Sequence, residues 1–392
     1  MSYCKIVLKP DKEESLLRFH PWVFSGAIQS IGGNPEEGDL VSLFSAKGQY
    51  LATGHYQIGS IAVRILTFNQ APVDDAFWRE RISSAYSLRL ALGLAGANDN
   101  NTYRLVHGEG DNLPGLIVDI YARTAVMQAH SVGMHHARRQ IAAAIKEVMG
   151  DSLLTIYYKS ETTLPYKANL SDEDGLLYGN EVEDIALENG LKFCVDWQKG
   201  QKTGFFVDQR DNRSLAERYA GGRRVLNMFC YTGGFSFYAM RGNAALVHSV
   251  DSSSRAISLT KKNIEMNFPG DLRHEAYAED AFKYLERAGN TYDMIILDPP
   301  AFAKHKNVLR NALKGYRKLN AIAFDKIKSG GILFTFSCSQ VVSREAFRLA
   351  VFSAAARSGR SVRILHQTAQ PADHPVNIYH PEGEYLKGLV LQ

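Results

Sequence analysis

The clearest hydrophobic pattern lies just past the middle of the chain, where strand, turn, helix and strand signals follow one another. Residues 225–229 and 246–250 are short apolar runs, which are typical of strands buried on both faces of a sheet. Between them, residues 231–234 have the composition of a turn and residues 235–241 can form a helix. Asp251 follows the second run. This order is the opening half of a nucleotide-binding α/β domain, in which an acid at the tip of the second strand accepts hydrogen bonds from ribose hydroxyls.

The turn in this pattern indicates which nucleotide it suits. Dinucleotide-binding turns carry G-x-G-x-x-G because their backbone amides must approach a pyrophosphate. Here a single glycine pair, Gly233 and Gly234, follows the aromatic Tyr231. A ligand with an adenosine but no phosphates needs no such cradle, and S-adenosylmethionine is such a ligand. The turn therefore favours a methyltransferase over a dehydrogenase, and a unit that binds no ligand is the remaining alternative.

The alternation of elements continues to the C-terminus. The predicted elements are helices at residues 255–266 and 343–358, strands at 293–297 and 331–336, and a closing antiparallel pair at 361–366 and 386–391. Ligands bind at the carboxyl ends of parallel strands. Four side chains fall at or just beyond such ends and should converge on one crevice: Asp251, Asp280, Asp298 and Cys338.

Asp298, Pro299 and Pro300 end the fourth strand of this series. Two prolines fix φ and cannot donate to a strand ladder, so they end the strand sharply and leave carbonyls and a carboxylate facing the crevice. Such a rigid set of acceptors suits a flat base with an amine and a ring nitrogen, on which Phe302 could stack. The alternative is that the prolines only terminate the strand.

Cys338 determines the type of reaction that the sequence predicts. Carbon 5 of cytosine is a poor nucleophile until a group adds covalently at carbon 6, and a thiolate is suited to that addition. A cysteine at a strand tip beside a methyl donor fits this role. The alternative is a small buried hydrophobic residue.

A basic run follows the two prolines. No acid occurs between Asp298 and Asp325, while basic residues recur at helical spacing: Lys306, Arg310, Lys314 and Arg317 or Lys318. A solvated helix face usually pairs its charges, and this run has no acids with which to do so. The pattern predicts a basic face that contacts phosphates on either side of a target nucleotide.

The segment before the nucleotide-binding unit is unusually polar for a helix start. Residues 199–213 contain Phe205 and Phe206, followed by Asp208 and Gln209. Such a segment could fold over the charged end of a cofactor, with a solvated helix start as the alternative.

The pattern of the first half of the chain predicts β-strands, followed by a mixture of helices and strands. The apolar runs at residues 40–44, 49–53 and 60–68 predict strands. Later predictions are helices at 74–94 and 135–149, a hairpin at 103–121, a strand at 122–131 and β structure at 183–195. Residues 160–180 show no dominant pattern.

Length and composition indicate a globular protein of two or three domains. The chain has 392 residues, of which 45% are hydrophobic and 22% charged, and it has no apolar run near the ~18 residues of a membrane span. We find no signal-peptide pattern at the N-terminus. The four cysteines are scattered without metal-type spacing, which favours free thiols in a reducing cytoplasm and predicts no metal site.

Charge is distributed unevenly along the chain. Residues 1–70 carry six basic and six acidic side chains, residues 71–189 carry ten and 17, and residues 190–392 carry 29 and 18. The last two hundred residues therefore have a net charge of +11, although the whole chain has only +4. This asymmetry predicts contact of the C-terminal part with a polyanion such as a nucleic acid.

The chain resembles the ribosomal RNA large-subunit methyltransferase I family over essentially its whole length. The segments that carry the resemblance are HPWVFSGAI, YRLVHGEGDNLPGLIVD, KTGFFVDQRDNR, VLNMFCYTGGFS, VDSSSRAI, LDPPAF, TFSCS and YLKG. The resemblance implies an α/β chain with a PUA-like domain at residues 1–70, a central α+β domain at 71–189 and a Rossmann-type methyltransferase domain at 190–392. It also implies that the enzyme makes 5-methylcytidine in large-subunit ribosomal RNA.

The resemblance implies a role for each site residue. S-adenosylmethionine would be held by Phe206, Gln209, Phe229, Tyr231, Thr232, Gly233, Asp251, Ser252, Asp280, Ala281 and Asp298. Cys338 would be the nucleophile, and Asp298 would engage the ring nitrogen and the amine of the base. The RNA would be contacted by Pro299, Pro300, Phe302, Lys306, Arg310 and Lys314. Other RNA cytosine-5 methyltransferases carry a second cysteine where this chain has Pro300, which leaves the group that removes the carbon-5 proton open.

Two other functions remain open at this stage. An N-methyltransferase would use Asp298 to polarise an exocyclic amine, and Cys338 would be incidental. A non-catalytic RNA-binding or assembly factor would bind RNA without turnover. The expected partner is large-subunit ribosomal RNA in the cytoplasm, without a membrane, and a homodimer is left open.

Overall fold

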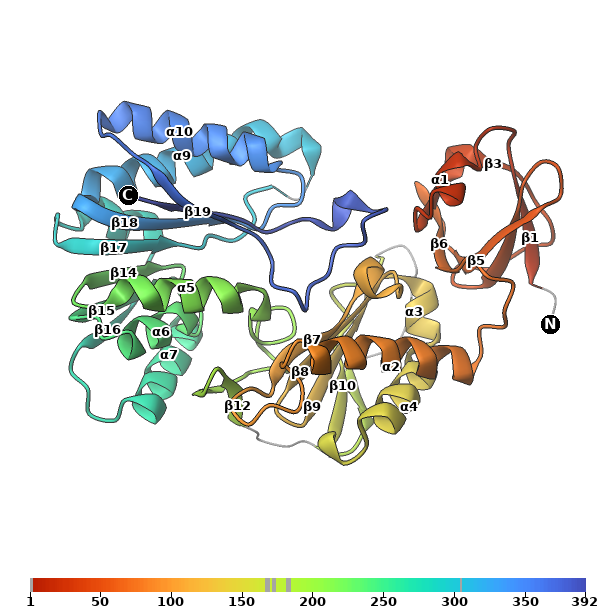
Figure 1. Cartoon of the computed structure of the whole chain (residues 1–392), viewed down its shortest axis with the longest axis horizontal. Helices are drawn as coiled ribbons and strands as arrows, with labels where there is room; N and C mark the ends of the chain where they lie inside the picture. Colours follow the sequence, from red (N-terminus) through yellow and green to blue (C-terminus); the bar gives the residue numbers. More distant parts are fainter. Residues whose placement is uncertain (1–2, 166–169, 171–173, 181–184, 304) are drawn as a thin grey trace. The chain divides into compact units, whose positions relative to one another are not determined.

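The computed structural model describes residues 3–165, 170, 174–180, 185–303 and 305–392. The chain forms two compact units, each assembled from three separate stretches (Figure 1). The first unit contains Met1–Gly190, Val195–Val207 and Ala372–Gly383, and the second contains Leu191–Cys194, Asp208–Pro371 and Glu384–Gln392. The three domain boundaries expected from the sequence stay predictions.

The first unit begins with a six-stranded sheet that curves around its own apolar core (Figure 1). The strand order is β2-β6-β5-β4-β1-β3, and all pairs are antiparallel except β1 with β4. Its elements are β1 (Cys4–Leu8), α1 (Glu14–Leu17), β2 (Trp22–Phe24), β3 (Ile28–Ile31), β4 (Leu40–Phe44), β5 (Tyr50–Tyr56) and β6 (Ile61–Thr67). The β structure predicted for this part is confirmed.

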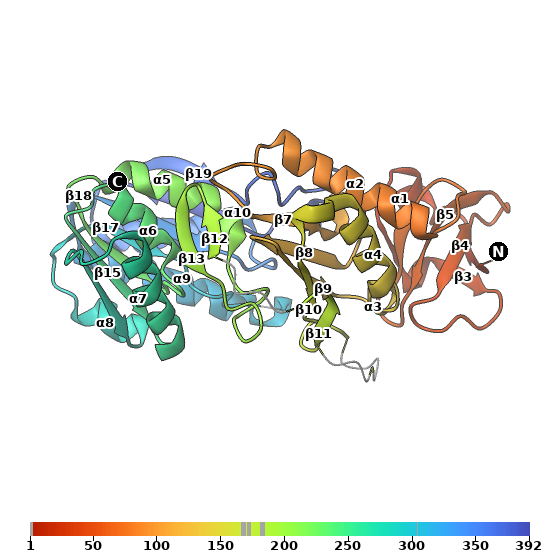
Figure 2. The same ribbon diagram turned by 90° about the horizontal axis from the view of Figure 1, so that it is seen from below.

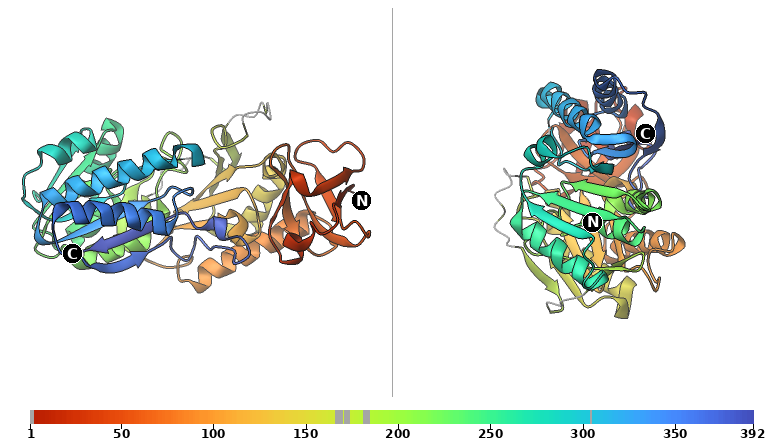
Figure 3. Two further views of the ribbon diagram at one scale, coloured as in Figure 1. Left: turned by 90° about the horizontal axis from the view of Figure 1, so that it is seen from above. Right: turned by 90° about the vertical axis from the view of Figure 1, so that its left-hand side faces the viewer.

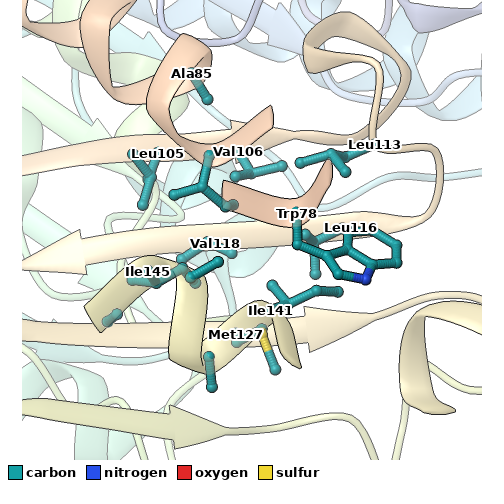
Figure 4. Packing of buried hydrophobic residues seen from close by; sticks show 14 of the residues in the cluster. Trp78, Ala85, Leu105, Val106, Leu113, Leu116, Val118, Met127, Ile141 and Ile145 are labelled. Atoms are coloured by element: carbon teal, nitrogen blue, oxygen red, sulfur yellow. The ribbon is translucent and has the colours of Figure 1, made fainter. Parts of the chain in front are cut away.

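A second sheet of the first unit packs against two helices (Figure 2). Its strand order is β11-β10-β9-β8-β7, with one parallel pair, β9 and β10. The elements are α2 (Asp75–Ala91), β7 (Thr102–His107), β8 (Leu116–Tyr121), β9 (Thr124–Ala129), α3 (Val132–His136), α4 (Arg138–Met149), β10 (Thr155–Tyr158) and β11 (Gly175–Tyr178), and β12 (Ile185–Glu188) follows outside this sheet. Trp78 and Ala85 from α2 and Ile141 and Ile145 from α4 close its core against Leu116 (Figure 4). The predicted hairpin at 103–121 is confirmed, but β11 lies where no pattern was found.

The stretch Ala372–Gly383 completes the polar interior of the first unit. Asp373 is fully buried, its carbonyl accepts from Arg89 Nη2 at 2.8 Å, and its Oδ2 accepts from the Arg104 backbone N–H at 3.0 Å. Arg89 also forms a bidentate ion pair with Asp111. Gly110 leaves no room for a side chain, because a Cβ there would lie 1.9 Å from the Pro375 carbonyl oxygen. These residues of the late sequence are therefore an integral part of the first unit.

The second unit is a seven-stranded sheet with the order β16-β15-β14-β17-β18-β20-β19. The first five strands are parallel, and β20 runs antiparallel to both of its neighbours. The strands are β14 (Arg224–Met228), β15 (Leu246–Asp251), β16 (His274–Ala278), β17 (Tyr292–Leu297), β18 (Ile327–Ser337), β19 (Ile364–Thr368) and β20 (Lys387–Leu391), with β13 (Leu191–Cys194) outside the sheet. Every strand predicted for this part is confirmed, including the closing antiparallel pair.

Helices cover both faces of this sheet (Figure 3). One face carries α8 (Ala281–Arg287), α9 (Leu309–Lys326) and α10 (Arg344–Ser358), and the other carries α5 (Arg210–Ala220), α6 (Gly234–Arg241) and α7 (Ser254–Asn267). The central strands are buried on both faces, which explains why they appear in the sequence as continuous apolar runs. From β14 the chain adds β15 and β16 on one side and then β17 and β18 on the other. The strand order therefore reverses at β14, and open α/β sheets bind ligands at such a position.

Candidate cofactor and catalytic site

The loop after β14 has an unusual backbone. Phe229, Tyr231 and Gly233 have φ angles of +58°, +48° and +89°, and bulky residues with positive φ are rare. The Tyr231 N–H donates to Asp251 Oδ2 at 3.0 Å, and its carbonyl accepts from Thr260 Oγ1 at 2.9 Å. Strained backbone of this kind is concentrated at functional sites. The loop is thus held in one shape at the switch point of the sheet.

Gly233 is required by its surroundings. A Cβ at this position would lie 2.7 Å from Thr260 Cγ2 and 2.8 Å from Phe237 Cε1. The backbone N–H of Gly233 donates to the Cys230 carbonyl at 2.8 Å, and the next residue begins α6. The loop therefore runs against α6 and α7 without a side chain between them, and Thr232 beside it is buried.

Replacing Gly233 by alanine is expected to destabilise the protein by about 1–3 kcal/mol, because a Cβ adds both overlap and positive-φ strain. The affinity for S-adenosylmethionine should fall as well, since the loop must move. Urea unfolding and calorimetric titration measure the two effects. Gly222→Ala is the matched control, because Gly222 also has a positive φ, +69°, but its Cβ would meet no atom within 4 Å. An equal loss of affinity in both variants would contradict the assignment.

Asp251 has its carboxylate oriented by two backbone amides. Oδ2 accepts from Tyr231 N–H, and Oδ1 accepts from Ser253 N–H at 2.9 Å. Each oxygen keeps a second lone pair, so the carboxylate can still accept from a ligand. Ser252 is exposed directly after it.

Asp280 and Ala281 lie just beyond the end of β16. Asp280 is exposed and caps α8, with Oδ1 accepting from the Lys283 N–H at 2.9 Å. Ala281 is buried. The side chain of Asp280 therefore has a local structural role, and its contact with a cofactor stays a prediction.

A polar network surrounds Asp298 at the end of β17. Its Oδ1 accepts from Gln209 Nε2 at 2.9 Å, and Gln209 Oε1 in turn accepts from Asn212 Nδ2 at 2.6 Å. Burial and the nearby charge of Asp208 raise the pKa of Asp298 to about 7, against the opposing effects of the Gln209 hydrogen bond and the Arg213 charge. At neutral pH this carboxyl group can therefore hold a proton and donate it, as a general acid does.

Asp208 is a second carboxylate in the same network. Its Oδ2 accepts from the Tyr385 hydroxyl at 2.7 Å, while Oδ1 is buried and has no hydrogen-bond partner among the described residues. A buried carboxylate oxygen without a donor is costly unless a ligand supplies one. The ammonium group of an amino acid moiety is a donor of this kind.

Cys338 follows the last residue of β18. Its Sγ donates a weak hydrogen bond to the Pro299 carbonyl at 3.9 Å. The flanking residues, Ser337 and Ser339, are fully buried and both contact the Tyr316 hydroxyl, at 2.9 Å and 3.3 Å. The thiol is therefore held beside the two prolines that follow Asp298.

The two prolines and Phe302 differ in their exposure. Pro299 is buried and Pro300 is exposed. The Phe302 ring packs on Tyr316, with 4.6 Å between the ring centroids, and it adjoins the core under α9. One face of the Phe302 ring is thus used inside the protein, and its stacking on a base stays a prediction.

The basic residues near α9 are exposed. Lys306 lies in a short 3-10 turn before the helix, and Arg310 and Lys314 lie in it. Within the described part of the chain, none of these three forms an ion pair or hydrogen bond. Lys318 differs, because its Nζ lies 3.3 Å from Glu286 Oε1. The expectation that the whole run is unpaired is therefore wrong for Lys318.

The role of Phe206 at this site stays a prediction. Phe206 falls within the first unit by its contacts, whereas Gln209 and the residues at the strand ends fall within the second. Cys230 is buried, and burial together with the Asp251 charge raises the pKa of its thiol, so this side chain serves packing.

A hollow of about 360 Å³, lined in part by Ile327 and Leu391, lies at the amino end of β18, away from the strand tips.

The comparison with known proteins first defines the class. The model of a family of S-adenosylmethionine-dependent methyltransferases matches residues 167–382, and that of a PUA-like domain matches residues 6–68. A structure described as a S-adenosylmethionine-dependent methyltransferase from Streptococcus mutans covers 100% of both chains with a TM-score of 0.84 at 23% identity. A methyltransferase solved with S-adenosylhomocysteine has the same score and coverage at 24% identity. The family match over residues 167–382 defines the class, that of S-adenosylmethionine-dependent methyltransferases, and the two structures share the fold.

The particular family follows from the curated relatives. The ribosomal RNA large subunit methyltransferase I of Tolumonas auensis is 41% identical over 396 residues, which cover 99% of this chain and 98% of the relative. The chain belongs to the ribosomal RNA large subunit methyltransferase I family. The predicted family, fold class and cofactor are confirmed. Within the described residues, no helix is both long enough and apolar enough to cross a membrane.

Sequence reasoning assigned no chemistry to Tyr385 or Lys387, and it named Asp208 only as part of a segment that could fold over the charged end of a cofactor. Asp208 and Tyr385 meet although they lie 177 residues apart, and Lys387 reaches the Cys338 loop from β20. The segments KTGFFVDQRDNR and YLKG contain them. Only the unusual polarity of the first segment could have pointed to one of them, since pairing across such distances leaves no local pattern.

Proposed function

We propose that this enzyme forms 5-methylcytidine in large-subunit ribosomal RNA through a covalent adduct between Cys338 and carbon 6 of the cytosine. The observation that supports this proposal most is the weak hydrogen bond of Cys338 Sγ with the Pro299 carbonyl. The acceptor Pro299 directly follows Asp298, whose raised pKa of about 7 suits a proton donor. A nucleophile and a general acid are the two groups that this reaction requires.

The reaction can be written with these two side chains. The Cys338 thiolate bonds to carbon 6, and the electron pair of the C5–C6 double bond shifts through carbon 4 toward N3. Asp298 donates its proton to N3 and neutralises the charge that develops there. Carbon 5 then takes the methyl group, whose bond to the donor's sulfonium sulfur would break to leave a neutral thioether. Transfer of the carbon-5 proton to a base, which is not assigned, restores the C5–C6 double bond, breaks the sulfur–carbon bond to regenerate the Cys338 thiolate, and returns the N3 proton to Asp298.

The residues around the strand tips fit S-adenosylmethionine, which supplies an electrophilic methyl group when it is bound. Asp251 would accept from the ribose hydroxyls, and the Phe229–Gly233 loop and Ser252 would border the adenosine. Asp280 and Ala281 would contact the adenine. The free Oδ1 of Asp208 would accept from the ammonium group, beside Gln209, Asp298 and the preceding Phe206.

Pro299, Pro300 and Phe302 would contact the target base, which must leave the base stack because its carbons cannot be reached within it. Lys306, Arg310 and Lys314 would contact the neighbouring phosphates. This assignment is supported by their exposure and by the lack of partners for them in the described part of the chain. We further propose a cytoplasmic location, and a homodimer is left open.

Replacing Lys306, Arg310 and Lys314 together by alanine is expected to weaken RNA binding and flatten its salt dependence. Each lost phosphate contact should lower the slope of log K against log salt by about 0.7 for single-stranded RNA. Fluorescence titrations at several salt concentrations measure this slope. Lys318→Ala is the matched control, because Lys318 lies on the same helix but pairs with Glu286. If the slope in Lys318→Ala falls by about the amount expected for one lost phosphate contact, the assignment of RNA contacts to Lys306, Arg310 and Lys314 is contradicted.

The test of the function is methyl transfer from labelled S-adenosylmethionine to unmodified large-subunit RNA, with the nucleoside product identified by mass spectrometry. Label in 5-methylcytidine supports the proposal. Label in a methylated exocyclic amine or another base supports the N-methyltransferase alternative, in which Asp298 polarises the amine. RNA binding with no transfer to naked or subunit-assembled RNA would support a non-catalytic factor.

A further inference from the structure

Lys387 is a buried lysine at the start of β20, outside the set of residues assigned above. It pairs across the sheet with Ser337, the last residue of β18 before Cys338. Lys387 is 5% exposed, and its Nζ donates to the carbonyls of Ser339 at 2.6 Å and Val342 at 2.7 Å. The ammonium group therefore ties the loop that carries Cys338 to the neighbouring strand.

The surroundings of Lys387 lack the usual compensation for a buried charge. An ammonium group away from water needs an anionic partner, because neutral carbonyls alone offset little of its desolvation. No described carboxylate lies within ion-pair distance of Nζ. Burial lowers the pKa of Lys387 to about 8. The charge of Cys338 opposes this effect, the positive charge of Arg344 adds to it, and the exposed Glu384 opposes it.

The other ionisable groups near the loop are engaged elsewhere. Arg344 of α10 donates to the Thr368 carbonyl at 3.0 Å and lies 3.9 Å from Glu384. The Tyr316 hydroxyl of α9 contacts Ser337 and Ser339. An ammonium group has three donors, and two of those on Lys387 are used by carbonyls. The third donor has no partner among the described residues. Of the charged groups around Lys387, Cys338, on the loop that Lys387 holds, has the largest effect on its pKa.

We infer that Lys387 is a positioning residue for Cys338, whose ammonium group both fixes the loop and supplies the positive charge that stabilises the thiolate. The inference rests on the proposed nucleophilic role of Cys338 and deepens it. A positive neighbour favours the charged form of an acid. When the thiol loses its proton to solvent, the product is a thiolate beside an ammonium group, and no further reactant is required.

The experiment measures the alkylation of Cys338 by iodoacetamide between pH 5.5 and 9.5, in the full chain, with the modified peptide quantified by mass spectrometry. Lys387→Gln keeps a donor for the two carbonyls without the charge, and Lys387→Met removes both. In Lys387→Gln the midpoint of the rate against pH should rise by about one pH unit or more, which corresponds to roughly tenfold slower alkylation near neutral pH. Lys387→Met should show at least the same rise, whereas Lys387→Arg keeps the charge and should restore most of the reactivity.

Cys194 in the same sample is the internal control, and its alkylation should be unchanged. An unchanged Cys338 midpoint in folded Lys387→Gln would overturn the inference and leave Lys387 with a structural role only. If Lys387→Met does not fold, Lys387→Gln and Lys387→Arg still decide between the two results. Alkylation involves neither RNA nor methyl transfer, so an unchanged Cys338 midpoint is distinct from failure of the proposed function. If the proposed function fails, Cys338→Ala would retain full methyl transfer.

Discussion

Replacing Cys338 by alanine is expected to reduce methyl transfer by at least about 10³-fold, because the variant lacks the atom that must bond to carbon 6 of the base. Binding of S-adenosylmethionine should be unchanged, since the residues assigned to the cofactor lie on other strand ends. Single-turnover transfer of labelled methyl groups measures the rate, and calorimetric titration measures the binding. Residual activity would arise only from the positioning of base and methyl donor.

The matched control is Cys194→Ala. Cys194 is also partly exposed and belongs to the same unit, but it ends β13, which is not part of the seven-stranded sheet. Its replacement should leave the rate within about twofold. Full activity in Cys338→Ala would remove the covalent mechanism and favour methylation of an amine, while the fold and the cofactor would be unaffected.

Asp298→Asn is expected to reduce the rate of transfer by about 10²- to 10⁴-fold, because an amide cannot act as a general acid toward N3. The pKa of Asp298 is raised to about 7, so its proton is present below that pH and is lost above it. The rate of the wild-type chemical step should therefore fall about tenfold for each pH unit well above 7, after correction for thiolate formation. The variant should lack this dependence.

Asp293→Asn is the control on the same strand. Asp293 lies near the amino end of β17 and forms an ion pair with Lys328 at 3.0 Å, away from the strand tips. Its rate and pH profile should match those of the wild type. A wild-type profile that keeps rising with pH above 8 would show that Asp298 acts as a carboxylate, and the role of proton donor would have to be given up.

The strands of the second unit could be predicted from the sequence because parallel strands buried on both faces are continuous apolar runs. The strand tips could be predicted for the same reason, since Asp251, Asp298 and Cys338 directly follow such runs. The strand β11 could not be predicted, because it is an edge strand of only four residues, none of them fully buried, within a stretch that is otherwise polar and rich in turn residues.

The rest of the candidate site depends on contacts between distant parts of the chain. Burial and the charge of Asp208, which lies 90 positions earlier, raise the pKa of Asp298, and the Cys338 loop is held by Lys387 from another strand. Neither relation leaves a periodic or local signal. The positive φ of Phe229 and Tyr231 was also unpredictable, since the sequence suggested that only glycines would adopt it.

The stretch Ala372–Gly383 has a consequence for how the protein is made. The first unit needs Asp373 to accept from Arg89 and from the Arg104 backbone, yet Asp373 is synthesised 269 residues after Arg104. During synthesis the N-terminal half therefore emerges before the segment that covers Arg89 and the Arg104 N–H and accepts hydrogen bonds from both, although N-terminal domains usually fold first on the ribosome. We expect it to remain incompletely ordered until the last twenty residues leave the exit tunnel, so that the complete chain, rather than either unit, is the species that becomes resistant to proteolysis.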